Sequence, residues 1–202
     1  MACHNNSSRS ITLGFADSFP SLMTHKHKLI FSTMIVLFVA SSLVKADLEL
    51  NQVPPLIQLA GDVGGRLDGT SWNSSELQGV VHILMYVDPD KVKVNEHVEE
   101  ALAKEQYPSE KIRSIAITNL AATWKPKFLI RKILKGKQKK YPRTTYVTDT
   151  SKVLVEQWGL LDDSYNVLVF GPNGNLLFNQ GKALSGVEVA NLTALIWLQI
   201  SN

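Results

Sequence analysis

The sequence predicts an α/β domain, a three-layer α/β/α sandwich with a mixed central sheet. Apolar stretches of strand length alternate with segments of helical periodicity, which is typical of strands joined by helices. Two short apolar strands near the end flank a Gly-Pro-Asn-Gly turn, which indicates an antiparallel hairpin. The chain has 202 residues, 45% of them hydrophobic, and one cysteine, which excludes a disordered, collagen-like or disulfide-rich protein.

The first half of the domain contains turns, a central strand and a helix. Residues 61–79 are rich in Gly, Asp, Asn and Ser and predict turns that join short strands. Residues 80–87 are apolar at both alternating positions, as in a strand covered on both faces. Apolar residues recur at helical spacing over 94–107, and Pro108 predicts the end of that helix.

The second half repeats this alternation and closes with the hairpin and a helix. Strands are expected over residues 112–118, 144–148, 166–170 and 175–178, and helices over 128–141, 151–158 and 185–200. Asp149 or Ser151 is the expected N-cap of the middle helix. We expect the first of these helices to bury Phe128, Ile130, Ile133 and Leu134, and all four tryptophans to lie in the core or at its edge.

Residues 1–46 are predicted to be a leader that ends in a signal peptide. A short cationic stretch precedes the apolar run 29–40, and the small residue Ala46 predicts cleavage directly after it. Met23 would begin a signal peptide of ordinary length and is an alternative start. An uncleaved anchor is the competing interpretation. The expected product is a periplasmic protein with a single domain over residues 47–202.

Charge is unevenly distributed along the expected mature chain. Cleavage takes away four of the 21 basic and one of the 18 acidic residues, leaving 17 of each. Nine of the remaining basic residues lie in one segment without an acid: Lys125, Lys127, Arg131, Lys132, Lys135, Lys137, Lys139, Lys140 and Arg143. This basic segment is either a solvated helix face or a surface for anionic lipid headgroups, lipopolysaccharide phosphates or an acidic protein. Nucleic acid is not an expected partner of an exported chain.

The most suggestive polar residues follow the first central strand. Asp88 and Asp90 flank a proline and could hold a hard cation or act as acid and base, although Asp-Pro-Asp is also an ordinary turn. His82 is expected to be a packed strand residue with a backbone partner, and His97 to be solvated. An enzyme that uses Asp88 or Asp90 with His82 remains an alternative. We assign no catalytic residue, metal or cofactor, because no nucleophile elbow or Walker motif is present.

A family resemblance is carried by residues 72–79, 95–108, Lys111, 139–142, Asp149, 157–160, 163–170, Gly174, 181–184 and 188–189. In their order and spacing these residues resemble the YtfJ family of bacterial periplasmic proteins. The resemblance implies a thioredoxin-like fold, a signal peptide and no established biochemical activity.

Two departures from an active thioredoxin concern its redox elements. Where such a protein carries Cys-x-x-Cys, this chain has residues 86–91, and where it usually carries a cis-proline, this chain has Ser164 and Tyr165. We therefore expect a non-catalytic binding or accessory protein whose contact surface comprises Asp88, Asp90, Ser164 and Tyr165. Its expected partner is another periplasmic protein.

Overall fold

The computed structural model describes residues 48–201, and the predicted leader lies outside them. A six-stranded sheet with the order β2-β6-β5-β4-β7-β8 forms the centre of the fold. Its strands are β2 (Gly64–Arg66), β4 (Val81–Val87), β5 (Ile112–Asn119), β6 (Thr144–Asp149), β7 (Tyr165–Phe170) and β8 (Leu176–Gln180). β4, β5 and β6 are parallel, whereas β2, β7 and β8 pair antiparallel with their neighbours. The predicted mixed sheet is confirmed.

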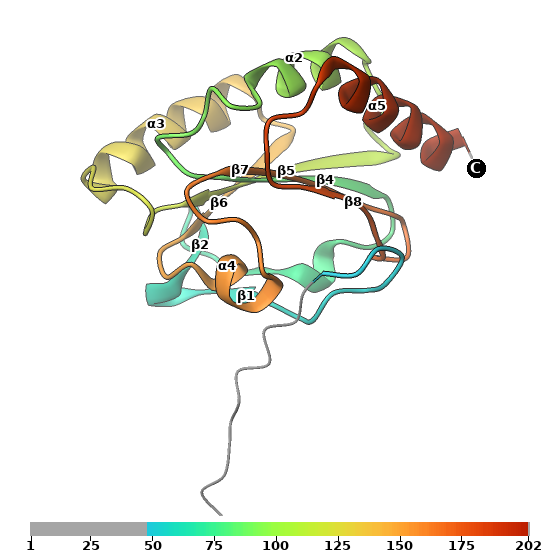
Figure 1. Ribbon diagram of the computed structural model, residues 1–202. Coiled ribbons are helices and arrows are strands. Elements are labelled where there is room, and N and C mark those ends of the chain that lie inside the picture. Colours follow the sequence, from blue (N-terminus) through green and yellow to red (C-terminus); the bar gives the residue numbers. More distant parts are fainter. Residues whose placement is uncertain (1–47, 202) are drawn as a thin grey trace, which may run out of the picture. The chain divides into compact units, whose positions relative to one another are not determined.

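Three helices cover one face of this sheet (Figure 1). They are α2 (Glu96–Lys104), α3 (Lys127–Lys140) and α5 (Gly186–Ser201). Under α2 and α5, alternate residues of β4 and β7 pack against apolar residues of the two helices, among them Ile83, Val167, Val98 and Leu192. A smaller cluster that includes Ile130 and Tyr146 lies under α3. The alternation of strand side chains therefore supplies the core on this side.

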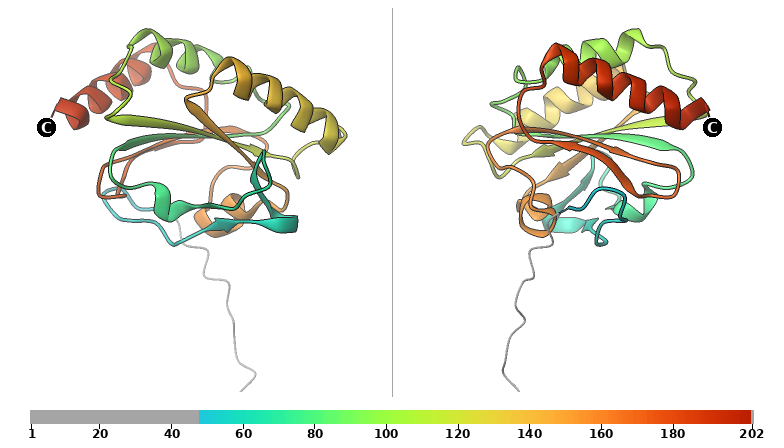
Figure 2. Two further views of the ribbon diagram at one scale, coloured as in Figure 1. Left: turned by 180° about the vertical axis from the view of Figure 1, so that it is seen from behind. Right: turned by 45° about the vertical axis from the view of Figure 1, so that its right-hand side comes forward.

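The opposite face is covered by a different kind of layer (Figure 2). It contains the two-stranded sheet of β1 (Gln58–Leu59) and β3 (Trp72–Asn73), the 3-10 turns η1 (Gly61–Val63) and η2 (Ser74–Glu76), and the short helix α4 (Val153–Trp158). Trp72 and Trp158 are fully buried in the core between this layer and the sheet. The predicted three layers are therefore present, but α4 is the one α-helix that the described residues contribute to this layer.

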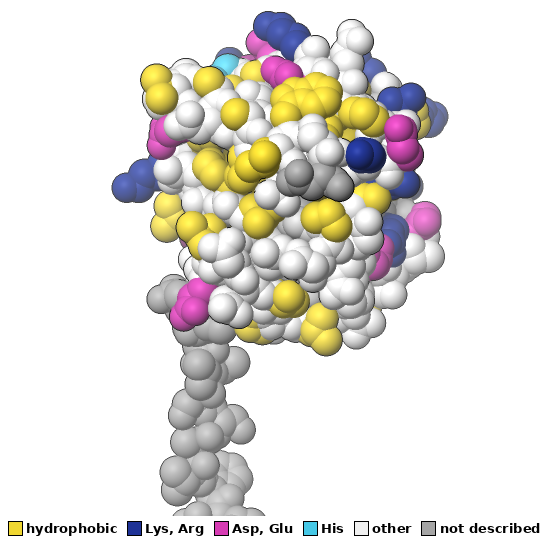
Figure 3. Space-filling view, turned by 90° about the vertical axis from the view of Figure 1, so that its right-hand side faces the viewer, with side chains coloured by type: hydrophobic (Ala, Val, Ile, Leu, Met, Phe, Trp, Pro, Cys, Tyr) yellow, Lys and Arg dark blue, Asp and Glu magenta, His cyan; other side chains and the backbone are white. Residues whose placement is uncertain are grey.

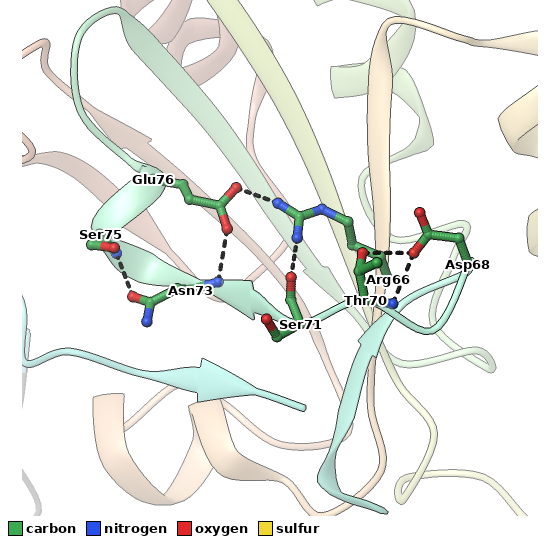
Figure 4. Close-up of polar contacts among 7 residues, drawn as sticks. All are labelled: Arg66, Asp68, Thr70, Ser71, Asn73, Ser75 and Glu76. Carbon is green, nitrogen blue, oxygen red and sulfur yellow. Dashed lines mark hydrogen bonds and ion pairs between the residues drawn. The ribbon is translucent and has the colours of Figure 1, made fainter. Parts of the chain in front are cut away.

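Polar contacts hold the turns of this layer (Figure 4). The Arg66 guanidinium pairs with Glu76 and donates to the Ser71 carbonyl. Glu76 Oε1 accepts from the Asn73 amide at 3.0 Å, and Asn73 Oδ1 accepts from the Ser75 amide at 2.9 Å. This reciprocal capping box fixes the start of η2.

Two helices differ in detail from the sequence prediction. α4 begins at Val153 because Lys152 adopts a left-handed conformation, with φ of 57°. The predicted N-cap, Asp149 or Ser151, is therefore wrong, because the N-cap is Lys152, whose side chain makes no capping bond. The Asp149 carboxylate instead accepts from the amides of Ser151 and Leu154. α2 spans Glu96–Lys104, and Gln106 with φ of 51° follows its end before Pro108.

The predicted buried face of α3 is half wrong. Ile130 and Leu134 face the sheet as expected, but Phe128 and Ile133 are 74% and 52% exposed. Trp124, which directly precedes the helix, is also exposed, contrary to the expected core or edge position. One row of apolar residues satisfies the contact with the sheet, so the remaining apolar side chains of α3 point into solvent.

Candidate functional site

Polar side chains gather where the three parallel strands end. Asp88 directly follows β4, Asn119 is the last residue of β5 and Asp149 is the last residue of β6. Register places Asn119 opposite Asp149. We call these residues, together with Asp162 and Ser164 from the loop before β7, the polar edge. The carboxyl ends of parallel strands are the usual place for ligands in open α/β sheets.

Asp88 is fully buried, and the segment before β7 holds it in place. Its amide donates to the Ser164 carbonyl at 3.0 Å, and the Ser164 amide donates back to Asp88 Oδ2 at 2.8 Å. The Ser164 hydroxyl donates to the carbonyl of Gly181. Asp88 Oδ1 is buried and has no hydrogen-bond partner. Half of this carboxylate therefore remains uncommitted.

The surroundings of Asp88 favour its protonated form. Burial is the largest cause, and it raises the pKa of Asp88 to about 6, with a further contribution from the negative charges of Asp162 and Asp163. The hydrogen bond from the Ser164 amide and the neighbouring Asn119 side chain lower this pKa and oppose the effect of burial. Asp88 can therefore gain or lose a proton close to neutral pH.

The remaining acids of this edge are neutralised or bonded. Asp162 pairs with Lys152 and accepts from Asn119 Nδ2 at 3.3 Å. Asp163 pairs with Lys91 at 3.2 Å. Within residues 48–201, no group of three or more His, Cys, Asp or Glu side chains is arranged to hold a metal ion. The arrangement can bind a proton or a hydrogen-bond donor.

Two of the predicted contact residues point elsewhere. The Asp90 carboxylate pairs with Lys125 and accepts from the Thr123 hydroxyl at 2.7 Å, so it tethers the loop before α3. These hydrogen bonds lower the pKa of Asp90, with the Lys125 bond as the largest cause. Tyr165 is fully buried, and its hydroxyl donates to Glu99 of α2. The structure thus brings Asp88 and Ser164 together and separates Asp90 and Tyr165 from them.

The histidines do not join this edge. His82 is buried near the start of β4, with Nδ1 at 2.9 Å from the Val80 carbonyl, which confirms the expected packed position with a backbone partner. Burial lowers the pKa of His82. Asp88 lies six positions further along the strand, a distance of about 20 Å. The alternative pairing of these two residues in one catalytic site is therefore wrong.

His97 differs from its expected solvated state in one contact. The residue is exposed on α2, and its Nε2 lies 2.8 Å from the Leu184 carbonyl. It links α2 to the loop before α5.

Sequence reasoning missed two buried polar residues around the polar edge, Asn119 and Asn95, and singled out Asp149 only as a helix cap. Asn119 and Asp149 end their strands, and Asn95 is fully buried in front of α2. Asn95 Nδ2 donates to the carbonyls of Tyr165 and Lys182, each at 3.1 Å, and its Oδ1 accepts from the Leu184 amide at 2.9 Å. Polar residues directly after an apolar strand were the available signal for Asn119 and Asp149. No sequence signal marked Asn95, because its partners lie 70 or more residues away.

A hollow lies at the opposite end of β4. It has a volume of about 280 Å³ and is lined by residues of the loop before β4, of the loop before β5 and of the C-terminal turn of α5. Figure 3 looks onto this end of the molecule, where hydrophobic side chains are prominent around the C-terminus. Tyr107 and Trp197 pack there with ring centroids 5.0 Å apart. No acid of the polar edge contributes to the lining of this hollow.

The basic segment forms α3 and the loops on either side of it. Lys125 is paired with Asp90, whereas most of the other basic residues project from the helix into solvent. In the part of the chain that the structure describes, no helix is both long enough and apolar enough to cross a membrane.

Comparison with known proteins identifies both the fold and the family. The thioredoxin domain of a thiol-disulfide oxidoreductase from Bacteroides vulgatus superposes with a TM-score of 0.53 at 14% identity, covering 74% of this chain and 98% of that one. The exposed lipoprotein thioredoxin Etrx1 from Streptococcus pneumoniae superposes with a TM-score of 0.52 at 11% identity, covering 70% and 99%. The thioredoxin-like fold is therefore confirmed.

Sequence comparison gives the relatives of the chain. The "Uncharacterized protein YtfJ" of Escherichia coli strain K12 is 25% identical over 129 residues, which are 62% of this chain and 70% of that relative. A family model described as "Bacterial protein of unknown function (YtfJ_HI0045)" matches residues 62–199. The chain therefore belongs to the YtfJ_HI0045 family of bacterial proteins, has the fold of thioredoxin and carries a single cysteine, Cys3, outside the matched region.

Proposed function

We propose that this protein is an exported periplasmic accessory protein that binds another protein without thiol chemistry. Its contact surface is the solvent-accessible part of the polar edge, Asp162 and Ser164, beside the buried Asp88. The proposal of export depends on the cationic stretch, the apolar run and the small residue Ala46 in the leader.

One observation carries the proposal for the site. Residues 86–91 stand where an active thioredoxin carries Cys-x-x-Cys, and they include Asp88, whose amide and carboxylate both bond to Ser164. No cysteine occurs in residues 48–201, so disulfide exchange has no nucleophile there. The same edge of the fold is retained with a different chemistry, namely a buried carboxyl group and backbone groups that bind by hydrogen bonding.

Export is tested by intact mass and cell fractionation. We expect the protein in the periplasmic fraction with Asp47 as its first residue. A protein that keeps residues 29–40 and sediments with membranes would support the anchor instead, and a cytoplasmic protein would contradict export altogether.

Partner binding is tested by site-specific photocrosslinking in the periplasm. A crosslinking residue replaces Asp163, which is exposed directly beside Ser164, and the matched control replaces Asn173, which is exposed at the tip of the β7–β8 hairpin. We expect a discrete adduct from position 163 that is absent from position 173. The same adducts from both positions, or none from position 163, would contradict a contact surface at the polar edge.

A further inference from the structure

The outer side of α3 and the loop before it present large apolar side chains to solvent. Trp124 is 87% exposed, Phe128 74%, Ile133 52% and Leu129 42%. Helical residues that are three or four positions apart share a face, so Leu129 and Ile133 are neighbours and Phe128 stands beside Lys132. We call these four apolar residues and the exposed lysines of α3 the α3 surface.

The lysines of this surface are available for a partner of opposite charge. Lys132, Lys135 and Lys139 are exposed. Among residues 48–201, the Lys125–Asp90 pair is the only ion pair that involves the basic segment. No acid lies between residues 125 and 143. The α3 surface therefore combines uncompensated positive charge with exposed aromatic and aliphatic groups.

The rest of the domain carries the opposite charge. Outside the basic segment, the chain from residue 47 onward has eight basic and 17 acidic residues. An anionic plane would attract the α3 surface and repel the remainder, which fixes the orientation of the molecule as well as its attraction. α3 lies in the same layer as α2 and α5, and no other described element covers the side of α3 that points away from the sheet (Figure 1).

We propose that the α3 surface docks on an anionic lipid bilayer. Lysines bind the headgroups, while the Trp124 and Phe128 rings and the Leu129 and Ile133 side chains enter the boundary between headgroups and acyl chains. Interfacial helices bind through the same two kinds of group, lysine for the headgroups and aromatic or aliphatic side chains for the acyl boundary, and in α3 both kinds lie on the outer side. Tryptophan is suited to this depth because its ring is apolar and its N–H is polar.

The charge arm of the test compares two variants that lose the same number of lysines. K132Q/K135Q/K139Q removes charge from the α3 surface, and K93Q/K104Q/K182Q removes exposed lysines elsewhere. The protein is used as purified from cells, every variant with the same N-terminus, and vesicles contain phosphatidylcholine alone or with phosphatidylglycerol. On anionic vesicles at low salt, we expect the α3 variant to bind roughly 100-fold more weakly. The control should change binding by less than about threefold.

The insertion arm uses Trp124 as a local probe. On anionic vesicles, its emission should shift to shorter wavelength and be quenched by brominated lipid, and both signals should be lost in Trp124→Phe. Phe128→Ser with Ile133→Ser should weaken binding about tenfold, because each removes apolar surface from the bilayer boundary. All of these side chains are exposed, so the fold should survive, which circular dichroism verifies.

Three results would overturn the proposal. These are equal losses for the two lysine variants, no binding to either vesicle by the unmodified chain, or binding that leaves Trp124 emission unchanged. The last result would indicate that only the lysines contact the headgroups.

Discussion

Asp88 and Asp149 are the same residue type at the same edge of the sheet, yet their carboxylates are used differently. Both are fully buried. Asp149 Oδ1 accepts from the Ser151 amide, and its Oδ2 accepts from the Tyr86 hydroxyl and the Leu154 amide. Asp88 has one oxygen bonded and one without a partner. The difference indicates that Asp149 has a structural role and stabilises the start of α4 through hydrogen bonds, whereas Asp88 can still bind a proton or a ligand.

Removal of the Asp149 carboxylate should have the largest effect. Asp149→Ala leaves three donors without their acceptor, two of them buried, and removes the hydrogen bonds at the start of α4. We expect the free energy of unfolding to fall by about 4 kcal/mol, measured by urea denaturation. The matched control is Asp62→Ala at an exposed position, which should leave the midpoint unchanged. If Asp149→Ala had the same midpoint as the Asp62→Ala control, the Asp149 carboxylate would not stabilise the start of α4.

Replacement of Asp88 should stabilise the protein at neutral pH, in contrast to replacement of Asp149. The pKa of Asp88 in the fold, about 6, is higher than the ordinary 3.8, so the folded state binds its proton more tightly than the unfolded state. The contribution of Asp88 to stability is therefore present below about pH 4 and is lost as the pH rises through 6. Asp88→Asn should remove this dependence of stability on pH, and it should raise the free energy of unfolding at pH 7 by about 2 kcal/mol.

Denaturation midpoints between pH 4 and 8 check this prediction. Asp90→Asn serves as the matched control, because the pKa of its carboxyl is lowered by its hydrogen bonds and not raised. If the midpoints of both variants changed with pH as those of the unmodified protein do, Asp88 would not be the titrating group.

Removal of one partner of Asp149 should cost less than removal of Asp149 itself. Tyr86→Phe deletes the hydroxyl that donates to Asp149 Oδ2 at 3.1 Å and leaves both amide donors in place. We expect a loss of about 1 kcal/mol in thermal or urea denaturation. A loss as large as that of Asp149→Ala would show that the bond to the Tyr86 hydroxyl, rather than the bonds to the amides, accounts for the contribution of Asp149 to stability.

The smallest effect is expected at Asp90. Asp90→Ala removes an exposed ion pair with Lys125, and such pairs contribute little because water screens them. The denaturation midpoint should not change measurably. A clear drop would mean that the loop before α3 depends on this tether for its position.

Much of the fold was predictable because strand and helix periodicities are local properties. The continuous apolar stretch at residues 80–87 predicted β4 to within one residue, and the turn at residues 171–174 predicted the β7–β8 hairpin. The short β1 and β3 strands were expected only as part of a turn-rich region. Each has two residues, and their pairing joins positions 58 and 73, so no local period marks them.

The candidate site was predictable only in part. The sequence predicted one surface of Asp88, Asp90, Ser164 and Tyr165, but the structure brings together only Asp88 and Ser164. The environment of each side chain depends on segments that the chain brings from far away. The Ser164 amide that bonds Asp88 is 76 residues distant, and the Thr123 hydroxyl that bonds Asp90 is 33 residues distant. Two carboxylates separated by one proline consequently ended in opposite environments.

Residue identity and local spacing are enough to predict the order of strands and helices, the mixed sheet, the absence of cysteine from the domain and the family resemblance. Tertiary packing alone sets which carboxylate is buried, which apolar residues of α3 remain outside the core and which distant donors reach Asp88 and Asp90. Burial and distance are set by packing between segments remote in sequence, and that packing is what turns a polar turn into a candidate site.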